Sequence, residues 1–274
     1  MNLRAVGIAA ATVVVALAVV AGGFLFLLGA LGGFGIAGSY NSYYQYDGTL
    51  ATNETLTNVT LYLPVPVANG TALIDAANVT VETEDGAADW RVELVETPEG
   101  PMLALTADRV EGELYYLVHE FADNGTHLGW EKVPEDELPA DMSNKRAYAE
   151  PTYYRFSVYV PVEDRVDVVD PVAGAAVLRP VENLTADACE PYWPDDENAA
   201  CTTFETPGYV AYETTDANVA HLTVELRGLN EWGFGLSNGF NEFVQEATLR
   251  MAGSQSGWVA MDGELYTGMG DETR

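Results

Sequence analysis

The segment Asn58-Val-Thr-Leu-Tyr-Leu-Pro-Val65 alternates aliphatic side chains with other residue types. Its aliphatic members all fall on one side of an extended chain, at Val59, Leu61, Leu63 and Val65. Successive side chains of a strand point to opposite faces of the sheet. This segment therefore predicts a strand with one buried face.

The same period of two recurs along most of the chain after residue 52. It predicts further strands at residues 78–81, 90–97, 102–107, 113–121, 153–162, 202–215, 220–229 and 258–266. We expect a mainly β, sandwich-like extracellular domain or pair of domains. One stretch has helical spacing instead, at Phe240, Phe243, Val244, Ala247 and Met251. With Ser237 or Asn238 as its N-cap and Gly253 as its end, it predicts a helix over 239–252.

Residues 5–38 contain no charged side chain. A helix formed by this run would be long enough to cross a bilayer core of about 30 Å. We expect residues 1–38 to form a transmembrane anchor. Arg4 precedes the run, and the next basic residue is Arg91, so the N-terminus should be cytoplasmic and the C-terminal region extracellular. The tyrosines that follow the run suit a membrane–water interface: Tyr40, Tyr43, Tyr44 and Tyr46.

Two other interpretations of this run stay open. A signal peptide could be cleaved after small residues near Ala21 or Ala37, although the apolar run is longer than such peptides usually carry. A pilin-like leader would instead be cut after Arg4.

Beyond the anchor, composition divides the chain into four parts. We expect a Tyr-rich stalk at 39–52, a first β unit at 53–130, an acidic, proline-rich loop or linker at 131–151 and a second β unit at 152–274. Whether the two β units are one domain or two stays open.

The extracellular region is strongly acidic. Residues 47–274 hold all 42 acidic residues and 11 of the 12 basic ones, a net charge of −31. Such a domain repels itself in dilute buffer. At molar salt the screening length falls to about 3 Å. The charge predicts a salt-requiring domain and excludes nucleic acid as a partner, because phosphate binding needs Lys and Arg.

Four features of the chain occur together: the uncharged anchor, the use of Arg over Lys, the acidic exterior and the segment Asn58-Val-Thr-Leu-Tyr-Leu-Pro-Val-Pro-Val67. With these features the chain resembles the membrane-anchored surface proteins of halophilic archaea. The resemblance implies a cell-membrane location and brings no activity and no site residues with it.

The cysteines and sequons fit an extracellular location. Cys189 and Cys201 are the only cysteines, and an even pair outside the cell usually oxidises. Two free thiols are the alternative. N-x-S/T sequons, which predict exposed glycosylation sites, begin at Asn53, Asn58, Asn69, Asn78, Asn124 and Asn183.

Candidate catalytic chemistry is sparse. Gly235-Leu-Ser-Asn-Gly239 matches G-x-S-x-G, but a nucleophile elbow has its histidine later in the chain. The histidines all precede Ser237, at His119, His127 and His221, and they lack metal-ligand spacing. Asp195, Asp196 and Glu197 have the oxygen ligands that calcium prefers, but a solvated acidic face is the default interpretation in a chain with so many acids. We predict no catalytic residue, no metal and no cofactor.

Two functional classes remain. The first is a membrane-tethered, glycosylated surface or envelope module that contacts a cell-surface protein. The second is an extracellular hydrolase or solute-binding protein whose site one sequence does not reveal. A pocket with convergent polar groups would favour the second class.

Overall fold

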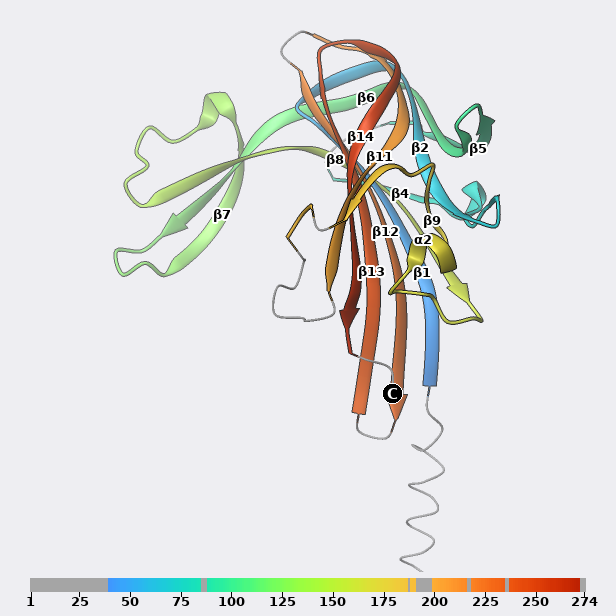
Figure 1. Ribbon diagram of the computed structural model, residues 1–274. Coiled ribbons are helices and arrows are strands. Elements are labelled where there is room, and N and C mark those ends of the chain that lie inside the picture. The colour runs from blue at the N-terminus through green and yellow to red at the C-terminus, as the bar shows by residue number, and fades with distance from the viewer. Residues whose placement is uncertain are drawn as a thin grey trace, which may run out of the picture. The chain divides into compact units, whose positions relative to one another are not determined.

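The computed structural model describes residues 39–84, 88–186, 188–190, 199–215, 218–234 and 237–271 (Figure 1). Within these ranges the chain is mainly strand, as predicted. The strands are β1 (Ser39–Thr52), β2 (Glu54–Ala68), β3 (Thr71–Ala72), β4 (Thr80–Glu84), β5 (Arg91–Thr97), β6 (Gly100–Phe121), β7 (His127–Pro134), β8 (Lys145–Val162), β9 (Val177–Arg179), β10 (Glu182–Ala186), β11 (Ala200–Glu213), β12 (Val219–Phe234), β13 (Ser237–Ala252) and β14 (Gln255–Gly270). The helical turns are η1 (Ala76–Asn78), η2 (Glu135–Glu137) and α2 (Pro171–Gly174).

The chain divides into two compact units. The larger comprises Ser42–Asn230 and Asn241–Arg274, and the smaller comprises Met1–Asn41 and Glu231–Phe240. In the smaller unit, the indole ring of Trp232 lies where a side chain on Gly239 would have to go, 2.6 Å from an ideal Cβ. Glycine at 239 therefore lets that ring pack on the backbone.

One large antiparallel sheet holds the strands, in the order β10-β11-β14-β13-β12-β1-β8-β6-β2-β3. An additional pairing of β11 with β2 joins two strands that are far apart in this order. The sheet therefore curls until it meets itself and surrounds one hydrophobic core.

Strands β6 and β8 pair with each other over only part of their length. Residues 114–120 of β6 pair with residues 145–151 of β8. Beyond that ladder, β6 takes β5 as its partner and β8 takes β4. The ring of Trp90 packs nearly perpendicular to that of Phe156, 5.0 Å away, and also contacts Tyr154. This indole therefore packs against β8 beyond the β6–β8 ladder.

This division gives the larger unit two regions. We call β7, together with residues 114–121 of β6 and 145–151 of β8, the arm. The rest of the sheet, which surrounds the core, is the body. In Figure 1 the arm is the green region that carries the label β7.

The expected stalk at 39–52 is strand β1, and this prediction of a polar stalk was wrong. Its residues alternate, and Tyr44, Tyr46 and Leu50 point into the core with at most 6% of their surface exposed. Tyr43 packs against Tyr159 of β8, with ring centroids 4.6 Å apart. Apart from Tyr40, which is exposed, the expected interface tyrosines thus pack within the protein.

The helix expected over 239–252 was also wrong, because this segment is strand β13. It pairs with β14 from Asn241↔Gly270 to Thr248↔Asp262. Phe243, Ala247 and Met251 are fully buried, and Val244, which points to the other face, is buried as well. Burial on both faces of the strand produced the apparent helical period. Gly253, the expected helix end, has a φ of 60° in the turn that follows.

Residues 163–181, here called the inner segment, are held by buried polar side chains. Asn230 accepts a hydrogen bond from the Val166 amide and donates one to the Val166 carbonyl, both at 2.9 Å. Gln245 accepts from the Leu178 amide at 2.7 Å. Asn230 and Gln245 are fully buried, and these hydrogen bonds satisfy the side-chain oxygen of each, although Nε2 of Gln245 has no hydrogen-bond partner among the described residues.

The expected anchor, residues 1–38, lies outside the described residues. Among the residues that are described, no helix has the length and apolar character needed to cross a membrane.

Candidate functional site

The most distinctive surface of the larger unit is one face of the arm. Residues that stand opposite each other in a ladder share a face of the sheet. Leu117 stands opposite Lys132 on one side and Tyr148 on the other, and His119 stands between Trp130 and Arg146. We define the arm face as Tyr115, Leu117, His119, Phe121, His127, Trp130, Lys132, Arg146 and Tyr148.

Contacts between aromatic and cationic groups organise this face. The Lys132 ammonium lies 3.6 Å from the ring centroid of Tyr115, and the Arg146 guanidinium lies 5.3 Å from that of Phe121. Both distances are within the range of cation–π attraction. The edge-on contact of His119 with Tyr148 adds a further ring pair, with centroids 5.4 Å apart.

The two arm histidines are hydrogen-bonded to each other, with Nδ1 of His119 3.0 Å from Nε2 of His127. One nitrogen must donate and the other must accept, so at least one of the two rings is neutral in this geometry. The arrangement orients both rings on the arm face.

The arm face combines exposed aromatic side chains with basic residues. Trp130 is 63% exposed and Tyr148 is 49% exposed. The face carries two of the chain's 12 basic residues, Lys132 and Arg146, and the ladder places one acidic residue, Glu150, at its edge opposite Tyr115. Exposed aromatic side chains of this kind mark binding surfaces.

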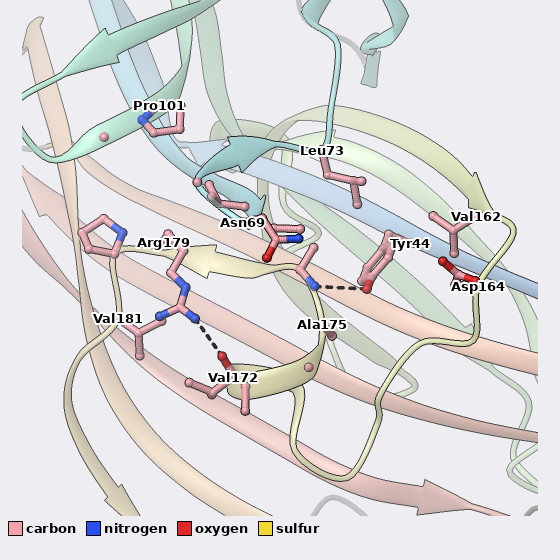
Figure 2. Close-up of a pocket in the computed structure, with 18 of the residues that line it drawn as sticks. Tyr44, Asn69, Leu73, Pro101, Val162, Asp164, Val172, Ala175, Arg179 and Val181 are labelled. Carbon is pink, nitrogen blue, oxygen red and sulfur yellow. Dashed lines mark hydrogen bonds between the residues drawn. The ribbon is translucent and has the colours of Figure 1, made fainter.

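A second feature is a groove beside the inner segment, with a volume of about 890 Å³. Figure 2 shows it between the turn at Asn69, the turn at Pro101 and helix α2. Its charged lining comprises Glu99, Glu163, Asp164, Arg165 and Arg179. A groove with groups of both signs suits a small polar or zwitterionic solute.

Hydrogen bonds hold the walls of the groove (Figure 2). Arg179 donates to the Val172 carbonyl at 2.8 Å, and the Tyr44 hydroxyl accepts from the Ala176 amide at 3.1 Å. Burial raises the pKa of Tyr44, with the hydrogen bond from Ala176 opposing this and the charge of Asp167 adding to it. Tyr44 is therefore a neutral hydrogen-bonding group that fixes the wall of the groove.

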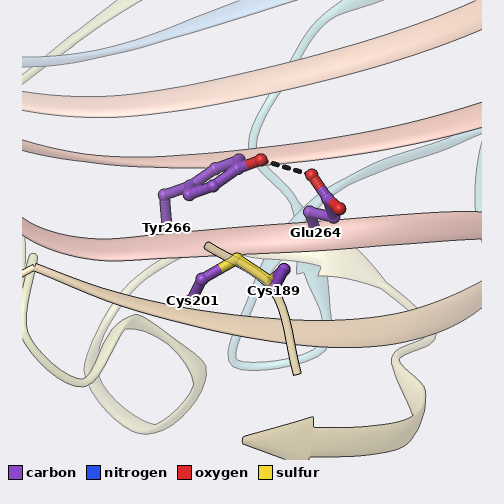
Figure 3. The surroundings of a disulfide bond; sticks show 4 residues. All are labelled: Cys189, Cys201, Glu264 and Tyr266. Carbon is purple, nitrogen blue, oxygen red and sulfur yellow. Dashed lines mark hydrogen bonds between the residues drawn. A yellow bond between two sulfur atoms is a disulfide. The ribbon is translucent and has the colours of Figure 1, made fainter. Parts of the chain in front are cut away.

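The predicted disulfide is confirmed: Cys189 is bonded to Cys201, with Cα atoms 5.4 Å apart. Cys201 is buried on β11 and stands opposite Tyr266 of β14. Figure 3 shows the bond beside Tyr266, whose hydroxyl donates to the Glu264 carboxylate. The bridge therefore attaches the segment before β11 to the β11–β14 ladder.

Five of the six sequon asparagines are exposed: Asn58, Asn69, Asn78, Asn124 and Asn183. Asn53 differs, because it is only half-exposed and its side-chain oxygen accepts a hydrogen bond from the Val219 amide at 2.8 Å. Asn58, Asn69 and Asn183 have left-handed φ values of 51–54°, which asparagine adopts more readily than most residues. Glycosylation remains a prediction, and Asn53 is its weakest acceptor.

Ser237 begins strand β13, so the G-x-S-x-G match lies before a strand and lacks the helix of a nucleophile elbow. Its side chain and the acidic residues Asp195, Asp196 and Glu197 lie outside what the structure describes. His221 is exposed on β12, whereas the other two histidines lie together on the arm. The described residues include no group of three His, Cys, Asp or Glu side chains placed to hold a metal.

The arm face was not predicted from the sequence. A signal was present, since both lysines of the chain and two of its three histidines fall within residues 119–145. That clustering alone could not show which side chains share a face, because the face depends on the pairing of three strands.

Comparison of the chain with family models, curated proteins and solved structures found no significant match.

Proposed function

We propose that this chain is a membrane-tethered, glycosylated interaction module at the outer surface of a cell in a high-salt environment. Its tether is the apolar run 1–38, its folded part is sandwich-like, and its contact surface is the arm face. The single observation that carries the proposal is the exposure of Trp130 and Tyr148 beside two cations on an otherwise acidic protein.

The arm suits contact better than catalysis. Trp130 and Tyr148 are 63% and 49% exposed, so these two rings are available to a partner. Burying a large exposed aromatic side chain stabilises an interface substantially, and such residues dominate binding energy. A cell-surface protein is the class of partner that we propose.

The groove beside the inner segment favours a second candidate function, the binding of a small solute. Its volume of about 890 Å³ lies within the range of ligand pockets. A hydrolase has weaker support, because the one nucleophile motif lies before a strand.

The test uses intact cells in molar salt. A photo-crosslinking residue at position 148 should capture a neighbouring protein, and the same residue at position 258 is the matched control. Trp258 is 42% exposed on the body, so this control has similar accessibility away from the arm. Equal capture from the two positions would contradict the proposal.

Two further readouts test the tether and the glycans. Protease added outside the cells should remove the folded region, and full protection would contradict the extracellular location. Mass spectrometry of the released glycopeptides should find Asn124 and Asn69 modified and Asn53 unmodified.

A further inference from the structure

The arm face carries more basic than acidic side chains, although the chain as a whole is strongly acidic. The whole protein carries a net charge of −30, whereas the arm face holds Lys132 and Arg146 with a single carboxylate, Glu150, at its edge. Complementary charge directs specific association. The acidic outer surface of another copy of this chain is complementary in charge to the arm face.

We propose that the arm face docks on the acidic outer surface of a second copy of this chain, in a head-to-tail contact. This inference rests on the proposed role of the arm as a contact surface and names the partner. Trp130 and Tyr148 supply the apolar part of the contact. Arg146 supplies a planar guanidinium group, which can donate two parallel hydrogen bonds to a carboxylate.

A two-fold contact between two arm faces does not fit the charges. In such an isologous contact each patch meets its own copy. Two patches that each carry Lys132 and Arg146 would then face each other, and like charges brought together are costly. A head-to-tail contact avoids this, and it can link more than two copies, in a ring or in an open row.

High salt makes this association feasible. Two chains that each carry a net charge of −30 repel each other at long range. With a screening length of about 3 Å at molar salt, this repulsion is removed while groups in direct contact still attract.

The test compares full-length chains in detergent micelles at molar salt by sedimentation velocity. Wild-type protein should form concentration-dependent oligomers, and Lys132→Glu/Arg146→Glu should weaken the association by about tenfold or more. Arg91→Glu/Arg109→Glu is the matched control, because it makes the same charge change at exposed body residues. It should associate as the wild type does.

Trp130→Ala leaves the charge unaltered and should also weaken association, which guards against misfolding of the charge-reversal variant. A monomeric wild type, or equal weakening by the arm and body variants, would overturn the proposal. Binding of the arm to anionic lipid vesicles without self-association would overturn it too.

A mixing experiment separates the two geometries. In a head-to-tail contact, the arm-reversed chain still offers its acidic surface, so immobilised wild type should capture it. Immobilised arm-reversed chain should not capture its own kind. Failure of wild type to capture the arm-reversed chain would indicate an arm-to-arm contact and overturn the proposal. If self-association fails while position 148 still captures another protein on cells, the proposed function survives and this inference falls.

Discussion

The body and the arm share two strands but differ in how those strands are covered. In the body, Leu103 and Leu105 of β6 and Phe156 of β8 are fully buried. In the arm, the same two strands continue to Leu117 and Tyr148, which remain partly exposed. A strand stabilises a fold only where a second layer covers one of its faces. The difference teaches that the body holds most of the buried core, whereas the arm buries only a few side chains, such as Val118 and Val133, and presents Trp130 and Tyr148 to solvent.

The sharpest way to break this comparison is a core truncation. Phe156→Ala should lower the free energy of unfolding by about 3–5 kcal/mol, because it opens a cavity beside Trp90. Denaturant unfolding in molar salt measures this loss. Trp130→Ala, which removes a larger but exposed ring from the arm, should change it by less than about 0.5 kcal/mol. Similar losses from both variants would show that the arm is part of the stabilising core.

The disulfide gives a second, smaller effect confined to the body. The double variant Cys189→Ser/Cys201→Ser should lose about 3 kcal/mol on the chain-entropy estimate for so short a loop. Hydrogen exchange should become faster in β11, which carries Cys201, and in its ladder partner β14, and stay unchanged in the arm ladder. Faster exchange in the arm as well would mean that the two regions unfold together.

The smallest expected effect depends on pH and comes from a buried carboxyl group. Burial raises the pKa of Glu242, the Arg227 guanidinium 3.3 Å away opposes this, and Glu225 adds to it. An acid whose pKa is raised by folding stabilises the fold when protonated. That contribution is present below the unfolded pKa of about 4.3 and is lost as the pH rises through the folded pKa.

Glu242→Gln, which mimics the protonated form, should therefore raise stability at pH 7 and have no effect near pH 4. Thermal unfolding at the two pH values measures the difference. Glu131→Gln, at an exposed position on the arm, is the control and should be neutral at both. A gain at pH 4 as large as that at pH 7 would refute the role of charge.

Sequence periodicity predicted the strands that have one covered face. The segments 58–65 and 153–162 lie within β2 and β8, where aliphatic or aromatic residues enter the core at every second position. It failed where both faces are covered, as at Phe243 and Val244 of β13. It also failed at Tyr44 and Tyr46, because a tyrosine suits a membrane interface and a protein core equally well.

The candidate site was less accessible to prediction than the fold. The disulfide could be predicted from the expected extracellular location and from the short spacing of Cys189 and Cys201. The arm face, in contrast, assembles Leu117, His119, Trp130, Arg146 and Tyr148 from three strands whose register no local pattern specifies. The groove similarly combines turns with the inner segment, which reaches its place through hydrogen bonds to Asn230 and Gln245.

The continuity of β8 from the body into the arm has a mechanical consequence. Strand β1 follows the proposed tether directly and pairs with β8 from Ser42↔Val162 to Thr52↔Thr152. A tensile load between tether and arm would enter β1 at its Ser42 end and β8 at its Thr152 end, which are opposite ends of this ladder. Ladder hydrogen bonds lie perpendicular to the strands, so the load would shear all of them at once. Such a junction resists rupture far better than one whose bonds open one after another.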